Sequence, residues 1–100
     1  MIKGTTPTHT FKLSVDTADV KEVKITYAQD NLVKIVKRTE ACELSGNQVS
    51  VRLTQEETFE LNHHRPVLIQ LRVLTVSGDA LASKVISVPA HRCLDTEVLK

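Results

Sequence analysis

The feature that most constrains the fold is a pair of apolar, β-branched segments in the second half of the chain. Residues 67–76 read VLIQLRVLTV and residues 80–88 read ALASKVISV, with Ser-Gly-Asp at 77–79 between them. β-Branched residues favour strands, and a two-residue loop with Gly first is typical of a type II′ hairpin. The sequence therefore predicts one long β-hairpin over residues 66–88 with its loop at 78–79.

That loop sets a register that the side chains can test. It pairs Ser77 with Ala80 and, further along, Leu71 with Ile86, and paired side chains share one face of a sheet. One face then carries Val67, Ile69, Leu71, Val73, Ile86 and Val88. The other face combines the polar residues Gln70, Arg72, Ser83 and Ser87 with four aliphatic residues, Leu74, Val76, Leu81 and Val85. Those four either lie under another loop of the chain or form a partner-binding patch, because exposed apolar patches usually mark contact sites.

The earlier part of the chain alternates apolar and polar residues in short runs that predict further strands. These runs lie at residues 8–15, 23–27, 33–35, 41–44 and 49–53. Residues 54–58 begin with Thr and have Glu three positions on, a capping-box pattern that predicts one short helical turn.

A three-residue loop at 29–31 would pair Tyr27 with Val33 and Ile25 with Ile35, so that Val33 and Ile35 face the core. Four basic residues would then face outward: Lys24, Lys34, Lys37 and Arg38. This is either a solvated face or a contact for an acidic partner.

One hundred residues predict a single domain, here residues 1–100, with an irregular arm at 1–7 and a tail at 89–100. The arm either frays or reaches a neighbouring subunit. The tail, which contains Leu94, Val98 and Leu99, either packs back on the domain, docks on a partner or is disordered. We therefore include Leu94, Val98 and Leu99 with the candidate partner-binding residues.

Composition argues against several kinds of ligand. The formal net charge is +1, and the aromatic residues are one Tyr and two Phe, which gives no electrostatic footprint for nucleic acid and little surface for base stacking. We find no long apolar run for a membrane span and no secretory signal pattern. The sequence predicts no nucleic acid, membrane or small-molecule substrate as partner.

No motif for catalysis or metal binding stands out. His63 and His64 are adjacent without a flanking acid or thiol, and Glu56 and Glu57 are neighbours on one turn. Cys93 near His91 would need an orienting acid to act as a nucleophile. Cys42 and Cys93 lack Cys-x-x-Cys spacing, and reduced thiols are favoured over a disulfide. We expect no enzyme, no cofactor and no metal site.

About seven short strands with almost no helix predict an all-β chain, an antiparallel β-sandwich of immunoglobulin-like arrangement. The chain has no Trp, so the antibody hallmarks are missing. A small β-barrel is the alternative.

Four pieces of the chain carry a family resemblance: GTTPTHTF (4–11), ITYAQ (25–29), LTQEET (53–58) and QLRVLT (70–75). With these, the chain resembles a family of small uncharacterised proteins of tailed phages and prophages of Gram-positive gut bacteria. The resemblance implies a virion or phage-accessory protein and assigns a role to no residue.

On this basis we expect a non-enzymatic virion protein, assembled in the bacterial host cytoplasm as a small subunit of the head, neck or tail. It would act by protein–protein contacts with other virion proteins or with copies of itself. The alternative is a phage-encoded inhibitor of a host or defence protein. Many inhibitors of nucleic-acid enzymes are strongly acidic, and this chain is not.

Overall fold

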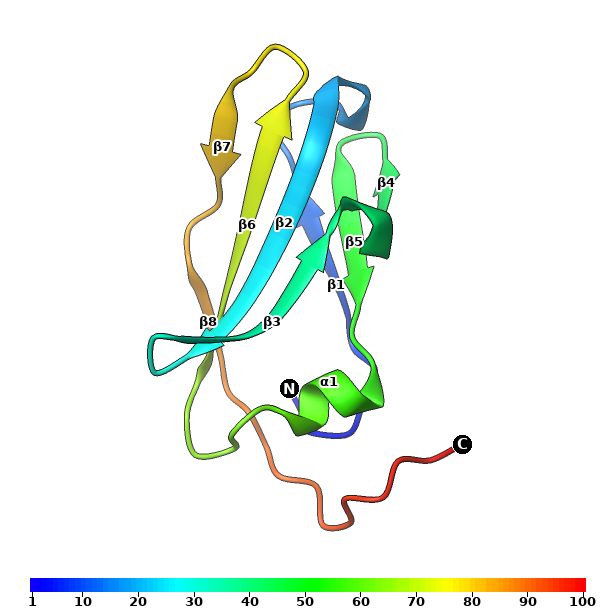
Figure 1. The fold of residues 1–100 in the computed structure, drawn as a ribbon, viewed down its shortest axis with the longest axis vertical. Coiled ribbons are helices and arrows are strands. Elements are labelled where there is room, and N and C mark those ends of the chain that lie inside the picture. The colour runs from blue at the N-terminus through cyan, green and yellow to red at the C-terminus, as the bar shows by residue number, and fades with distance from the viewer.

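The computed structural model describes residues 1–100 as two antiparallel β-sheets packed face to face (Figure 1). The smaller sheet has the order β1 (Thr8–Lys12), β5 (Gln48–Arg52), β4 (Cys42–Ser45). The larger has the order β3 (Leu32–Arg38), β2 (Val20–Gln29), β6 (Val67–Thr75), β7 (Ala80–Ala82), and β8 (Ile86–Val88) also pairs with β6. The prediction of an all-β antiparallel sandwich is confirmed.

Three short helical segments join the strands: η1 (Thr17–Asp19), η2 (Thr39–Ala41) and α1 (Gln55–Phe59). The capping box before α1 is confirmed. The Thr54 side chain accepts from the Glu57 amide at 3.1 Å, and the Glu57 carboxylate accepts from the Thr54 amide at 2.8 Å. None of the helices is long and apolar enough to cross a membrane.

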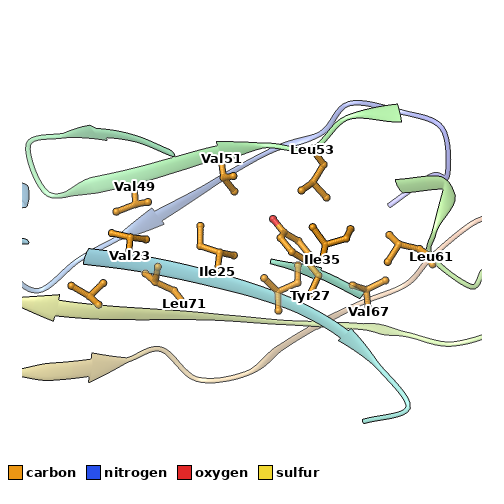
Figure 2. Close-up of a cluster of buried hydrophobic side chains, with 13 residues drawn as sticks. Val23, Ile25, Tyr27, Ile35, Val49, Val51, Leu53, Leu61, Val67 and Leu71 are labelled. Carbon is orange, nitrogen blue, oxygen red and sulfur yellow. The ribbon is translucent and has the colours of Figure 1, made fainter. Parts of the chain in front are cut away.

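The core lies between the sheets, where alternate residues of β2, β5 and β6 meet (Figure 2). It consists of Val23, Ile25, Tyr27, Ile35, Val49, Val51, Leu53, Leu61, Val67, Ile69, Leu71, Val73 and Ala90. Each fully buried Val, Leu or Ile side chain stabilises the fold by roughly 1.5–3 kcal/mol relative to its exposed state. The predicted inward positions of β6 are therefore correct.

The register of the β6–β7 hairpin differs from the prediction. Leu74 pairs with Ala80 and Val73 with Leu81, so the loop has three residues, 76–78, instead of two. Gly78 is the third loop residue and has φ +96°, the left-handed position that ends such a loop. The Thr75 hydroxyl accepts from the Asp79 amide at 2.9 Å and stabilises this turn. The predicted pairing of Ser77 with Ala80 is wrong.

The second half of this hairpin is also interrupted. The register shifts by one residue between β7, where Arg72 pairs with Ala82, and β8, where Ile69 pairs with Ile86. Near this break, the Ser83 hydroxyl accepts from the Leu71 amide at 3.0 Å. The predicted single strand over 80–88 is thus two short strands.

The β2–β3 connection is a two-residue turn and not the predicted three-residue loop. Asp30 and Asn31 both have positive φ, +50° and +64°, as a type I′ turn requires. A bulge follows, because Tyr27 pairs with Ile35 whereas Ala28 pairs with Val33. Ile35 is buried as predicted.

The two-residue turn sets Val33 opposite Ala28 on the outer face of the sheet, and the prediction that Val33 faces the core is wrong. Lys37 shares the inner face with Ile25, its partner on β2, and its side chain is only 13% exposed. The prediction that Lys37 faces outward is therefore also wrong.

Both chain ends pack on the domain beside α1. The Met1 nitrogen donates to the Pro89 carbonyl at 2.7 Å, and the His91 amide donates to the Met1 carbonyl at 2.8 Å. At the other end, the Gln55 side chain donates to the Leu99 carbonyl and accepts from its amide, both at 2.9 Å. The tail therefore touches the domain at His91 and Leu99, while most of the residues between them are exposed.

Gly4 in the arm provides a test of this packing. Gly4 and Gly46 both have positive φ, +79° and +59°, but a Cβ on Gly4 would lie 2.5 Å from Cζ of Phe59, whereas Gly46 faces open space. Both Gly→Ala changes carry a left-handed backbone cost of about 1–2 kcal/mol. We expect Gly4→Ala to reduce the free energy of unfolding by about 1–3 kcal/mol more than Gly46→Ala, from overpacking against α1. Urea denaturation of both variants measures the difference, and equal losses would show that the arm does not pack on Phe59 in solution.

Candidate functional site

The outer face of the larger sheet carries three cross-strand rows, which the register of β3, β2 and β6 defines. The first row is Val33, Ala28 and Leu68; the second is Val36, Thr26 and Gln70; the third is Arg38, Lys24 and Arg72. We call these nine residues the outer face. Paired side chains on neighbouring strands are close enough to act as one surface.

The outer face exposes aliphatic side chains at its β3 margin. Val33 is 62% exposed and Val36 is 39% exposed. The two-residue turn puts Val33 on this face, and the bulge that follows it brings Val36 to the same face. The result is two exposed aliphatic side chains along β3, next to the third row, which is basic.

The third row consists of basic residues only, and we call it the basic row. Arg38 has one carboxylate near it, with Nη1 3.8 Å from Oε1 of Glu22, and both side chains are about half exposed. Lys24 and Arg72 take part in no ion pair. The three basic residues line a hollow of about 280 Å³ that also includes Glu22, Leu74 and Ala80.

A second group of polar residues lies between the sheets. The Tyr27 hydroxyl is 2.7 Å from Nδ1 of His9 on β1, and in Figure 2 it points toward the opposite sheet. Burial, with smaller contributions from Cys42 and Glu57, raises the pKa of Tyr27 above its ordinary value. Burial, followed by the positive charge of the chain's amino end, lowers the pKa of His9. Both residues are thereby held in the neutral form, as a hydrogen-bonded pair that links the two sheets.

Lys37 and Glu57 form a second, partly buried pair, with Nζ 2.6 Å from Oε1, and we call His9–Tyr27 and Lys37–Glu57 the interior pairs. Burial acts to raise the pKa of Glu57, but the bonds from Lys37 and Thr54 outweigh it and hold that pKa below its ordinary value. Burial raises the pKa of the nearby Cys42 thiol, which donates to the Arg38 carbonyl at 3.3 Å. A thiol held protonated is a poor nucleophile. These groups satisfy one another's hydrogen-bonding and charge requirements, and they link β1 to β2 and β3 to α1.

The structure divides the apolar patch predicted near the hairpin tip. Leu81 pairs with Val73 and faces the inter-sheet side, where it lines a hollow of about 110 Å³ with Leu13 and Val15. Leu74 lies on the opposite side of the sheet from Leu81, and Val76 and Val85 are exposed. The prediction that all four share one face is wrong, because the three-residue loop shifts the register by an odd number of residues.

The other predicted positions are spread over the molecule. In the tail, Leu94 is 90% exposed, Leu99 is also exposed and Val98 is half-buried. The rings of His63 and His64 lie 4.0 Å apart, centre to centre, and no three His, Cys, Asp or Glu residues group as a metal site. Cys42 and Cys93 are free thiols.

Sequence reasoning identified part of the outer face and missed the rest. Lys24 and Arg38 were predicted to face outward on neighbouring strands, and Arg72 outward on β6. The three residues align in one row because β2 pairs with β6, and no local sequence pattern predicts that pairing. The Asp-Asn dipeptide at 30–31 was the signal for the tighter turn, because both residue types tolerate positive φ.

The interior ion pair generates a prediction for acid stability. Because the folded-state pKa of Glu57 lies below its ordinary value of 4.5, the ion pair stabilises the fold above about pH 4.5 and is lost as pH falls through the folded-state pKa. At pH 7, Glu57→Gln should lower the free energy of unfolding by about 1–2 kcal/mol, with Gln still able to cap α1. The deficit should shrink toward pH 3. Glu56→Gln, on the same helical turn but without an ion pair, is the control. A deficit independent of pH, measured by urea denaturation, would contradict this role.

Comparisons of the chain with protein-family models, with curated proteins and with solved structures found no match. The outer face, the basic row and the interior pairs are therefore interpreted from their own geometry and chemistry.

Proposed function

We propose that this chain is a non-enzymatic structural protein of a tailed-phage particle, a small β-sandwich subunit that acts through protein–protein contacts. Its partners are other virion proteins or further copies of itself, and its location is the virion. The phage setting comes from the sequence resemblance. The mode of action comes from the outer face.

The observation that carries the proposal is the exposed aliphatic margin of the outer face beside its basic row. Val33 and Val36 lie on one face of the larger sheet, on its edge strand β3, at 62% and 39% exposure. Interfaces between proteins combine apolar contact with charged residues that select the partner. The interior pairs, His9 with Tyr27 and Lys37 with Glu57, satisfy one another, which suits a scaffold that holds its outer face still.

The strand order supports an immunoglobulin-like assignment within this proposal. If β1 is taken as the second strand of that fold, β1-β5-β4 corresponds to its B-E-D sheet. The order β3-β2-β6 with β7 and β8 then corresponds to its C-F-G sheet extended by one edge strand. The helix α1 lies in the connection between the two sheets. Such sandwiches serve many unrelated functions, so the assignment concerns architecture alone.

The alternative is a phage-encoded inhibitor that binds a host or defence protein through the same face. Both proposals require the outer face, and they differ in where the chain is found. The test is mass spectrometry of gradient-purified particles and of the infected-cell lysate. A virion subunit is expected in washed particles at a constant ratio to the major particle proteins. A chain present in the lysate but absent from particles would overturn the structural role and favour the inhibitor.

The outer face itself can be tested by paired substitutions. Val33→Ser with Val36→Ser removes the exposed aliphatic margin and should reduce incorporation into particles at least about tenfold, because each lost apolar contact weakens binding by roughly 1 kcal/mol. Val76→Ser with Val85→Ser is the control at the hairpin, where both side chains are also exposed. Thermal unfolding establishes that both variants fold. A larger loss in the control would assign the contact to the hairpin instead.

A further inference from the structure

We propose that the basic row binds carboxylates of an acidic protein segment. The site is Arg38, Lys24 and Arg72, with the hollow that they line. This inference rests on the proposed function and adds to it the chemistry of the partner.

The first argument is that the row is unfavourable in the isolated chain. Lys24 lies directly between Arg38 and Arg72 in the register, so two like-charged pairs face each other across neighbouring strands. Like charges opposite one another destabilise a sheet. The only nearby acid, Glu22, is 3.8 Å from Arg38 and half exposed, which gives weak compensation. Arrangements that break a local rule are expected at functional sites.

The second argument is the shape and lining of the hollow. Its volume is about 280 Å³, and three cations, one acid (Glu22) and apolar residues that include Leu74 and Ala80 line it. The guanidinium groups of Arg38 and Arg72 can each bind a carboxylate through two parallel N–H donors. Lys24 supplies a third positive charge at the centre. The hollow thus suits a short segment that presents carboxylates together with aliphatic carbon.

The third argument excludes a symmetric pairing of two outer faces. An isologous dimer requires a patch that is complementary to itself. The three rows are aliphatic, polar and basic, and the one acid next to them on this face is Glu22, against three cations. Face-to-face stacking would therefore set cations against cations or against Val33 and Val36. A foreign protein surface that carries both acidic and apolar side chains matches the rows better.

Nucleic acid fits the same face less well. The nine residues of the outer face include no aromatic side chain for base stacking, and the chain carries a net charge of only +1. Two of the three rows are uncharged, so only one row would contact phosphate.

The test is an NMR titration of the isotope-labelled full chain at low salt with a peptide that alternates Glu and Ala. We expect the largest amide shifts at Lys24, Arg38 and Arg72, no comparable shifts with the matched Gln–Ala peptide, and weaker binding at higher salt. The variant Lys24→Gln/Arg38→Gln/Arg72→Gln should bind at least about tenfold more weakly, because three charge-assisted contacts are lost.

The control is Lys12→Gln/Lys84→Gln/Lys100→Gln, which lowers the net charge from +1 by the same three units but leaves the basic row intact. Equal losses in both variants, or shifts centred elsewhere, would overturn the proposal. Tighter binding of a single-stranded oligonucleotide at the same row would also overturn it. So would a dimer, seen by light scattering, that the basic-row variant abolishes.

A stability measurement tests the first argument separately. Lys24→Glu would convert the row into alternating charges and should raise the Tm by about 2–4 °C. An unchanged or lower Tm would show that the three adjacent cations do not destabilise the fold.

If the basic-row variant enters particles normally while Val33→Ser/Val36→Ser does not, the carboxylate inference fails and the proposed function stands. If neither variant affects incorporation, the outer face is not the contact.

Discussion

The alternation of side chains along β2 is the constraint on which the rest of the molecule depends. β2 pairs with β3 on one side and with β6 on the other, so both faces of the larger sheet take their order from it. Its inward residues, Val23, Ile25 and Tyr27, are fully buried in the core. Its outward residues, Lys24, Thr26 and Ala28, stand at the centre of the three rows. The last residue, Gln29, closes the strand with bonds to Asn62 and Arg65.

The sequence predicted the strands well because period-two alternation is a local property. It also predicted α1, because the capping box lies within four residues and satisfies both backbone donors itself. It failed at register. The loops after β2 and β6 each differ by one residue from their predicted lengths, and two insertions then shift the pairing again, at the bulge in β3 and at the break between β7 and β8. A bulge is chosen by the fit between strands that are distant in sequence, which local propensity does not report.

In the candidate site too, local alternation predicted which way side chains face, and long-range pairing decided which of them meet. That Lys24, Arg38 and Arg72 face outward could be read from alternation, but their alignment required the pairing of β6 with β2. The interior pairs join residues that are 18 and 20 positions apart in sequence, His9 with Tyr27 and Lys37 with Glu57. A basic residue in an alternating strand is ordinarily solvated, so Lys37 gave no sign that α1 would supply its partner.

The irregularities of the strands have a consequence for how copies of this chain can meet. At the margins of the two sheets, β3 carries a bulge, β4 has four residues, β1 has five, and β7 and β8 have three each. No margin offers the long, flat row of free backbone groups that another strand needs for continuous addition. Short and bulged margins of this kind disfavour the edge-to-edge strand pairing from which fibrils grow. The sheet faces, where side-chain chemistry selects the partner, are then better suited to association than the sheet edges.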